Sequence, residues 1–170
     1  MRADDADLIG MLNSAWEVMR YLTGRPLTIA ESRAEVAASL GNRWLLFTLD
    51  DGGFVGWVGA DPAETQNQYD IGWRLVRSAW GDGLASEAAR ALVDELFGHG
   101  ADRVTATTMA VNARSRGVME RIGLEYFRTF HLDIEDPLPG TEHGEVQYHL
   151  TRRAWDRSRS AESPNSIGPT

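Results

Sequence analysis

The sequence contains no cysteine, which excludes a disulfide framework, a cysteine-ligated metal site and a thiol nucleophile. Its four histidines, His99, His131, His143 and His149, show none of the spacings of a zinc site, so no metal is expected. No apolar run reaches the length of a membrane span or of a signal-peptide core. We therefore expect a cytoplasmic protein without a membrane partner.

Basic residues are fewer than acidic ones, 17 against 25, and the formal net charge is −8. This balance argues against nucleic acid as a partner and slightly favours amine-bearing partners through electrostatic steering. The length of 170 residues and the hydrophobic fraction of 42% suit one globular domain with a substantial core. The sequence has no internal repeat.

The hydrophobic pattern changes period along the chain, which predicts a mixed α+β domain. Helical spacing is expected over 6–21, 28–40, 84–97 and 113–122, and strands over 43–51, 54–60, 69–76, 103–111, 124–132 and 145–151. A hairpin turn at Asp51-Gly52-Gly53 joins the first two strands. The order favours one central, largely antiparallel sheet within a domain of residues 1–152. Residues 153–170 are rich in Ser, Arg and Pro without a period, which predicts a mobile tail.

One stretch, SAWGDGLASEAARALVDELF over 78–97, places two glycines directly before a helix. A helix N-terminus leaves backbone N–H groups unpaired and carries partial positive charge, so it favours an anion. Gly81 and Gly83 would let that backbone approach the anion without a Cβ in the way. A phosphate fits this chemistry. The alternative is a glycine turn that joins a strand to a helix and binds nothing.

Two motifs resemble the GNAT superfamily of N-acetyltransferases. The run WGDGLASEA, residues 80–88, looks like the family's acyl-CoA pyrophosphate loop, Gln/Arg-x-x-Gly-x-Gly/Ala, with Trp80, Gly83 and Ala85 on its fixed positions. A tryptophan in the first place is similar to the RimJ/RimL branch. The run NARSRGVMERIGL, residues 112–124, is similar to that branch's Asn-x-x-Ser-x-x-Val-Met/Leu-Glu-Lys/Arg-x-Gly-Phe/Leu.

The resemblance implies a GNAT fold. Its mixed, mostly antiparallel sheet would have six to seven strands and about four flanking helices, with a V-shaped acyl-CoA cleft between the fourth and fifth strands. Family members carry a strand ahead of the first helix, and this sequence starts just after the expected position of that strand. Either the sheet has six strands here or the chain begins late. The implied activity is direct transfer of an acetyl group from acetyl-CoA to a primary amine, on a small molecule or a protein N-terminus, within a ternary complex. A homodimer is common in the family.

The resemblance also implies the cofactor-binding residues. The diphosphate would lie on the loop, and the pantetheine arm would pair beside the preceding strand. Arg114, Arg116 and Arg121 are candidates to reach the ribose phosphate, and the alternative is that they form a solvated helix face. The residues assigned to acetyl-CoA are Leu75, Val76, Arg77, Trp80, Gly81, Asp82, Gly83, Leu84, Ala85, Ser86, Asn112 and Ser115. Asp82 departs from the pattern, because relatives often carry a basic residue there.

Two proton transfers need catalytic groups. The position of the tyrosine that many relatives use as an acid holds Met119 here. The RimL-like branch uses a serine at the position of Ser115, so the resemblance implies that Ser115 protonates the departing thiolate. The alternative is that Ser115 only stabilises the helix N-terminus. Asp70 is the first candidate for the base. Its rivals are Glu145, Glu135 and His131.

The acceptor is expected to meet Arg20, Tyr21, Asp70 and His131, with loops 20–28 and 133–144 setting its identity. Two other functions remain open. One is a catalytically weak acyl-CoA-binding or regulatory module, favoured by Met119 and Asp82. The other is acetylation of an aminoglycoside-type antibiotic, which the acidic net charge would suit.

Overall fold

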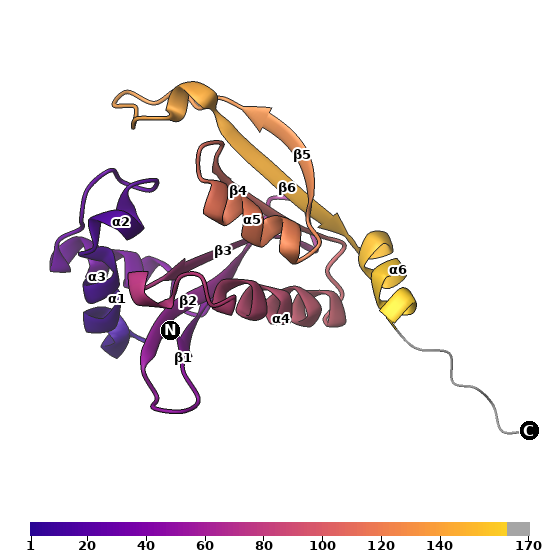
Figure 1. The fold of residues 1–170 in the computed structure, drawn as a ribbon, viewed down its shortest axis with the longest axis horizontal. Helices are drawn as coiled ribbons and strands as arrows, with labels where there is room; N and C mark the ends of the chain where they lie inside the picture. The colour runs from indigo at the N-terminus through magenta and orange to yellow at the C-terminus, as the bar shows by residue number, and fades with distance from the viewer. Residues whose placement is uncertain (163–170) are drawn as a thin grey trace, which may run out of the picture.

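The computed structural model describes residues 1–162. Helices flank one sheet, and the described residues end in a helix on the side of the molecule away from the N-terminus (Figure 1). The elements in order are η1 Ala3–Asp5, α1 Ala6–Asn13, α2 Trp16–Met19, α3 Ile29–Ala38, β1 Arg43–Phe47, β2 Phe54–Pro62, β3 Gln68–Leu75, η2 Arg77–Ala79, α4 Leu84–Gly98, β4 Arg103–Met109, α5 Ala113–Arg121, β5 Glu125–Phe130, η3 Thr141–His143, β6 Glu145–Thr151 and α6 Arg152–Glu162.

The sheet has six strands in the order β1-β2-β3-β4-β6-β5. Every neighbouring pair is antiparallel except β3 and β4, which run parallel and are joined by α4. This confirms the α+β class and the mostly antiparallel sheet. Within the described residues no strand precedes α1, so β1 is an edge strand, and the Met1 amino group donates to its Arg43 carbonyl at 2.5 Å.

The two parallel strands stay together over a short distance only. Gln68, Tyr69 and Asp70 pair with Arg103, Val104 and Thr105, and no pairing follows toward the C-terminal ends of either strand. Beyond this junction β3 keeps β2 as a neighbour and β4 keeps β6. The sheet therefore opens into the predicted V between β3 and β4. These are the fourth and fifth strands in the family's count, because no strand precedes α1 within the described residues. A ligand gains access to strand backbone at this opening.

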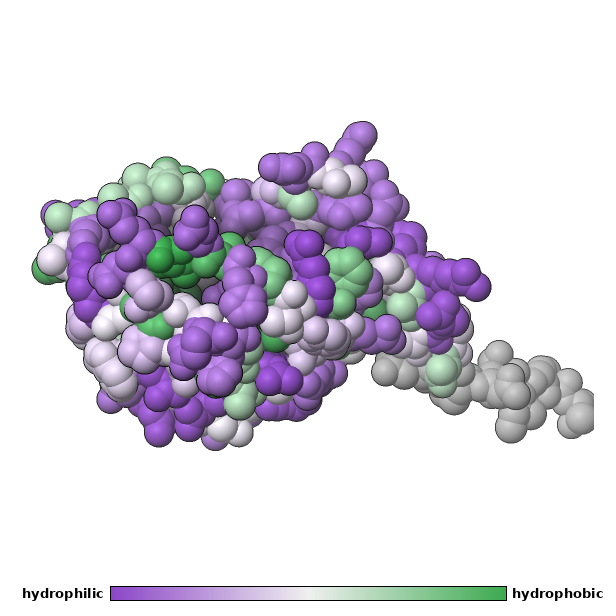
Figure 2. Space-filling model, turned by 90° about the horizontal axis from the view of Figure 1, so that it is seen from above, coloured by the Kyte–Doolittle hydropathy of each residue, from purple (hydrophilic) through white to green (hydrophobic). Residues whose placement is uncertain are grey.

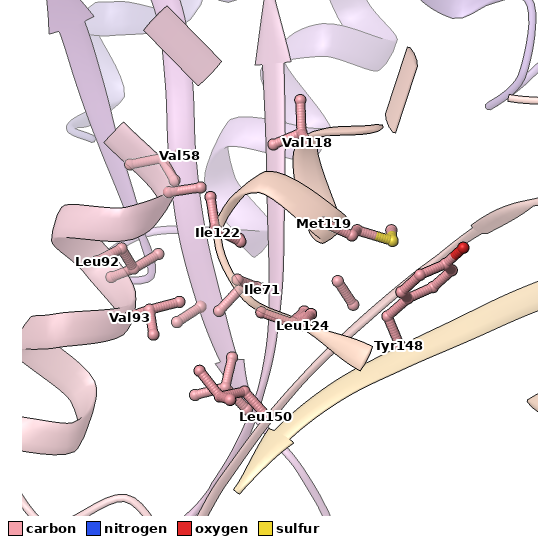
Figure 3. Packing of buried hydrophobic residues seen from close by; sticks show 14 of the residues in the cluster. Val58, Ile71, Leu92, Val93, Val118, Met119, Ile122, Leu124, Tyr148 and Leu150 are labelled. Carbon is pink, nitrogen blue, oxygen red and sulfur yellow. The ribbon is translucent and has the colours of Figure 1, made fainter. Parts of the chain in front are cut away.

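Helices cover both faces of the sheet. Under α4 and α5, buried side chains from the sheet and both helices meet in one cluster (Figure 3), with Phe97, Val104 and Met119 each 1% exposed or less. On the opposite face α1, α2 and α3 enclose a second cluster around Trp57. Side chains of β3 point alternately to the two faces of the sheet, so this strand contributes to both clusters. Ile71 belongs to the first cluster, and Arg74 contacts Trp57 on the other face.

Two helix predictions need correction. The single helix expected over 6–21 is broken into α1 and α2, because Ala15 takes an extended backbone with φ −85° and ψ 116°. Residues 153–162, predicted as part of a mobile tail, lie in α6, so residues 1–162 contain six α-helices where about four were expected. Trp155 stacks on Phe97 at 5.2 Å and its Nε1 donates to Asp94 at 2.7 Å. The rest of the predicted tail, 163–170, lies outside the described residues.

Candidate active site

The glycine loop after β3 holds open donors at the start of α4. Gly81 and Gly83 have φ of +103° and +82°, a left-handed conformation that glycine tolerates best. Gly83 is the N-cap, and the first α-type bond runs from Glu87 N–H to its carbonyl at 3.0 Å. The amides of residues 84–86 therefore have no intrahelical acceptor. A Cβ at either glycine would meet no atom within 4 Å, so the space in front of these donors is free.

Trp80 fixes the loop to the end of β3. Its Nε1 donates to the Leu75 carbonyl at 2.9 Å, and its ring packs against the cluster under α1 and α2. The guanidinium groups of Arg77 and Arg114 lie 4.9 and 5.2 Å from the ring centroid. Arg114 belongs to α5, so Trp80 links the two sides of the opening and brings a cation toward the loop.

The start of α5 forms the opposite wall. Asn112 is its N-cap, since its Oδ1 accepts from the Ser115 N–H at 3.3 Å while its Nδ2 donates to Thr108 Oγ1 at 3.0 Å. The Ser115 hydroxyl makes no hydrogen bond within residues 1–162, which leaves it able to act on a ligand. Met119, assigned from the sequence to the position of the family's tyrosine, is 1% exposed and also lines the cavity.

A cavity of about 660 Å³ unites these elements. One face of the molecule is hollowed, with apolar residues in the hollow and hydrophilic residues around it (Figure 2). The predicted residues that line the cavity are Arg20, Tyr21, Leu75, Trp80, Gly81, Asp82, Gly83, Leu84, Ala85, Ser86, Asn112, Arg114, Ser115 and Arg121. A second, more open hollow of about 460 Å³ lies between loop residues 132–142, away from the glycine loop.

The other predicted cofactor residues lie outside the lining. The Val76 N–H donates to the Val55 carbonyl at 2.9 Å, so it is not available to a pantetheine arm. Arg77 is exposed and contacts Trp80 from outside the cavity. Arg116 points away, because its guanidinium donates to the Tyr148 hydroxyl at 3.3 Å and to the Ala110 carbonyl at 3.1 Å.

None of the base candidates from the sequence lines the cavity. Asp70 lies where β3 and β4 separate, and Thr105 Oγ1 donates to its Oδ1 at 2.9 Å. Asp70 as a residue is exposed, but neighbouring groups strip water from its carboxylate. This desolvation raises the pKa of Asp70 above its ordinary value, against the lowering effect of the Thr105 bond. Burial also raises the pKa of Glu145. His131 and Glu135 are exposed on the loop after β5.

The sequence reasoning missed much of the lining, and the residues that matter most for its chemistry are Glu17, Trp57 and Arg74. Glu17 and Asp82 supply its only carboxylates. Arg74 had a visible signal, because it is the charged residue in an otherwise apolar strand end, WRLV over 73–76. Glu17 had none, since a carboxylate on a short helix is usually a solvated surface group.

Two searches of the described residues address other chemistry. Within residues 1–162 no group of three His, Asp or Glu side chains is placed to hold a metal ion. Among the helices of that same part of the chain, none is both long and apolar enough to cross a membrane.

Comparison with known proteins agrees with this geometry. Residues 1–125 match the family described as the acetyltransferase (GNAT) domain. A relative from Aspergillus fumigatus, named FsC-acetyl coenzyme A-N(2)-transacetylase, is 35% identical over 160 residues, covering 83% of this chain and 67% of its own.

Solved structures share the fold. A GNAT-family acetyltransferase from Bacillus anthracis superposes with a TM-score of 0.77 at 24% identity, covering 90% of this chain and 92% of its own. RimL, a ribosomal L7/L12 α-N-protein acetyltransferase in complex with coenzyme A, gives 0.73 at 19% identity, covering 91% and 92%. From the family match and the relative's identity, the chain belongs to the GNAT family and is an N-acetyltransferase.

Proposed function

We propose that this protein transfers an acetyl group from acetyl-CoA directly to a primary amine, with both substrates bound together. The observation that carries the proposal is the glycine loop at the mouth of the β3–β4 opening. It presents unpaired amides at a helix N-terminus, and apart from the adjacent residues no protein atom of residues 1–162 lies within 4 Å of where a Cβ would stand at Gly81 or Gly83. A diphosphate fits such a cradle by charge and by close backbone approach.

Acetyl-CoA supplies an activated acyl group as a thioester, and the chain's own residues place it. The amides of residues 84–86 would hold the diphosphate, with Arg114 contributing positive charge. The edge of β3 would hold the pantetheine arm. The Val76 N–H group points toward β2, and successive N–H groups along a strand point to opposite sides. Leu75 and Trp73 therefore direct their N–H groups toward the opening. These donors are positioned to stabilise negative charge that develops on the acetyl carbonyl oxygen.

Two side-chain roles complete the transfer. The acceptor ammonium must lose a proton before its nitrogen attacks the thioester carbon, which is easier for an α-amino group with a pKa of about 8 than for lysine at about 10.4. Glu17 is the proposed base because it lines the cavity, and Asp70 is the alternative because it lies at the junction of β3 and β4. As the new C–N bond forms and the C–S bond breaks, the Ser115 hydroxyl supplies a proton to the sulfur, and solvent then replaces it.

Calorimetric titration with acetyl-CoA and with free CoA is the first test. We expect micromolar binding of both, and a folded protein that binds neither would refute the assignment of the loop. Turnover is then measured with a panel of amines by the thiol released, which comes from CoA alone because the chain has no cysteine. Intersecting initial-rate lines support a ternary complex, whereas parallel lines would indicate a covalent enzyme intermediate.

A catalytically weak acyl-CoA-binding module is the second candidate. Two observations favour it, namely that Met119 is buried where relatives carry a catalytic tyrosine, and that Asp82 adds a carboxylate to the lining near the diphosphate site. Binding of acetyl-CoA without turnover of any amine would support this candidate. Acetylation of one panel member at a rate above the uncatalysed reaction excludes it.

A further inference from the structure

The cavity has two halves that lie on opposite faces of β3. Leu84 to Ser86 and Ser115 belong to the face of α4 and α5. Arg74 belongs to the other face, because it bonds to Asn13 of α1 and forms an ion pair with Glu35 of α3. We call the lining on this second face the acceptor half. Its polar and aromatic residues are Glu17, Arg20, Tyr21, Trp57 and Arg74.

The acceptor half contains two guanidinium groups, although the whole chain carries a net charge of −8. Glu35 compensates the charge of Arg74, so the positive charge left for a ligand is that of Arg20. Arg20 is half-buried at the end of α2, and its guanidinium makes no hydrogen bond or ion pair within residues 1–162. It lies 4.3 Å from the centroid of the Tyr21 ring, and its buried Nε has no acceptor. A cation in a cavity without a counter-ion pays a desolvation cost that a bound anion would relieve.

Arg74 adds a second guanidinium that is held in place. Its side chain is 11% exposed, and it pairs with Glu35 at 2.9 Å and lies 5.3 Å from the Trp57 ring centroid. Its Nε is also buried without an acceptor. Fixed arginines lose little freedom on binding and present a planar fork that matches a carboxylate.

We infer that the acceptor is an amine that also carries a carboxylate, and that Arg20 binds this carboxylate with Arg74 beside it. The inference rests on the proposed function. Glu17 is the single carboxylate of the acceptor half, so it can serve one ammonium group. Aminoglycosides and polyamines carry several ammonium groups and would place them against two arginines. The acceptor half therefore selects amino acids or peptides with a free carboxyl group over polycations.

The test compares acceptors that differ only in this carboxylate. Amino acids and dipeptides are each assayed beside their primary amides, with spermidine and kanamycin as polycationic acceptors, and kcat/KM is measured by thiol release. We expect at least a tenfold preference for the best acid over its amide. Acetylation of the enzyme's own side chains cannot contribute to the released thiol, because the sequence contains no lysine.

The variant Arg20→Gln is expected to remove this preference by raising KM for the acid, with KM for the amide and the dissociation constant of acetyl-CoA unchanged. Arg33→Gln is the matched control, because Arg33 lies on α3 with its side chain 65% exposed and outside the cavity lining. The control should leave every constant unchanged. Restored preference in Arg20→Lys would show that the charge itself acts.

Three results would overturn the inference, and they are distinguishable. Turnover of amides or polycations without any acid would reject the carboxylate while the acetyltransferase function stands. An Arg20→Gln variant that weakens acetyl-CoA binding and keeps the acid-to-amide ratio would assign Arg20 to the coenzyme's phosphates. A folded wild-type protein that fails to bind acetyl-CoA in the calorimeter would reject the proposed function, and the inference with it.

Discussion

Replacing Gly83 by alanine isolates the contribution of the loop backbone to acetyl-CoA binding. Gly83 lines the cavity with φ +82°, and an added Cβ would stand in open space without touching any protein atom. Packing inside the protein is therefore not disturbed. The methyl group instead occupies space in front of the amides at the start of α4, where the proposed diphosphate must approach closely.

Two magnitudes follow. A left-handed alanine costs about 1–2 kcal/mol of folding free energy, which lowers the melting temperature of a chain of this size by about 2–8 °C. A hydrogen bond to a charged group is worth about 1.5–3 kcal/mol. At about 1.4 kcal/mol for each factor of ten, losing one such bond weakens acetyl-CoA binding by about 10- to 100-fold.

Gly100 provides the control at the other end of α4. It has φ +97° and also nothing within 4 Å of its Cβ position, so Gly100→Ala carries the same strain about 25 Å away along the helix. Calorimetry with acetyl-CoA and thermal melts are measured for both variants. We expect similar melting temperatures and a loss of affinity in Gly83→Ala alone. Wild-type affinity in Gly83→Ala, or an equal loss in both variants, would refute the reasoning.

Three further predictions follow. Ser115→Ala should lower kcat by about 100-fold without changing the dissociation constant of acetyl-CoA or the melting temperature, because only the Ser115 N–H takes part in the helix cap; an unchanged kcat would remove Ser115 from the mechanism. Asp70→Asn should raise stability at neutral pH. Folding raises the pKa of Asp70, so the folded state favours the neutral carboxyl group. In the wild type, the free energy of unfolding therefore falls as the pH rises above the ordinary pKa of 3.8. Asp70→Asn has no such group and lacks this fall. Melting curves of Asp70→Asn and wild type should therefore converge at acidic pH, and a constant offset would contradict this. Glu35→Gln should cost about 3 kcal/mol in urea unfolding, because it leaves the buried Arg74 charge uncompensated; a change within error would mean that Asn13 suffices.

Local pattern predicted those parts of the protein whose conformation depends on near neighbours. The apolar stripe of α4, the alternation of β3 and the cap at Asn112 are each encoded within a few positions, and all three are present. The glycine loop is of the same kind. Its backbone needs a positive φ at Gly81 and Gly83, and the presence of glycine at these two positions is enough to permit that conformation.

Predictions failed where a distant partner decides the structure. The helix α6 contains mostly arginine and serine without an apolar stripe, and it depends on Trp155 meeting Phe97 and Asp94 from α4. The break at Ala15 is similar, because the apolar spacing runs on through it. Propensity over a few residues cannot register a contact that forms only after the chain has folded.

The sequence by itself determined the family, the fold and the loop proposed for the coenzyme, because these depend on local backbone geometry and on motifs of contiguous residues. The acceptor half depended on tertiary structure. Glu17 and Arg20 belong to α2 and its C-cap, and Arg74 belongs to β3. Only the folded chain brings them to one cavity, beside the point where β3 and β4 separate after Asp70. The separation of the strands and the faces on which α2 and α4 pack determine which charged groups surround an acceptor. Both depend on contacts between residues far apart in the sequence, so no short stretch of the chain predicts them.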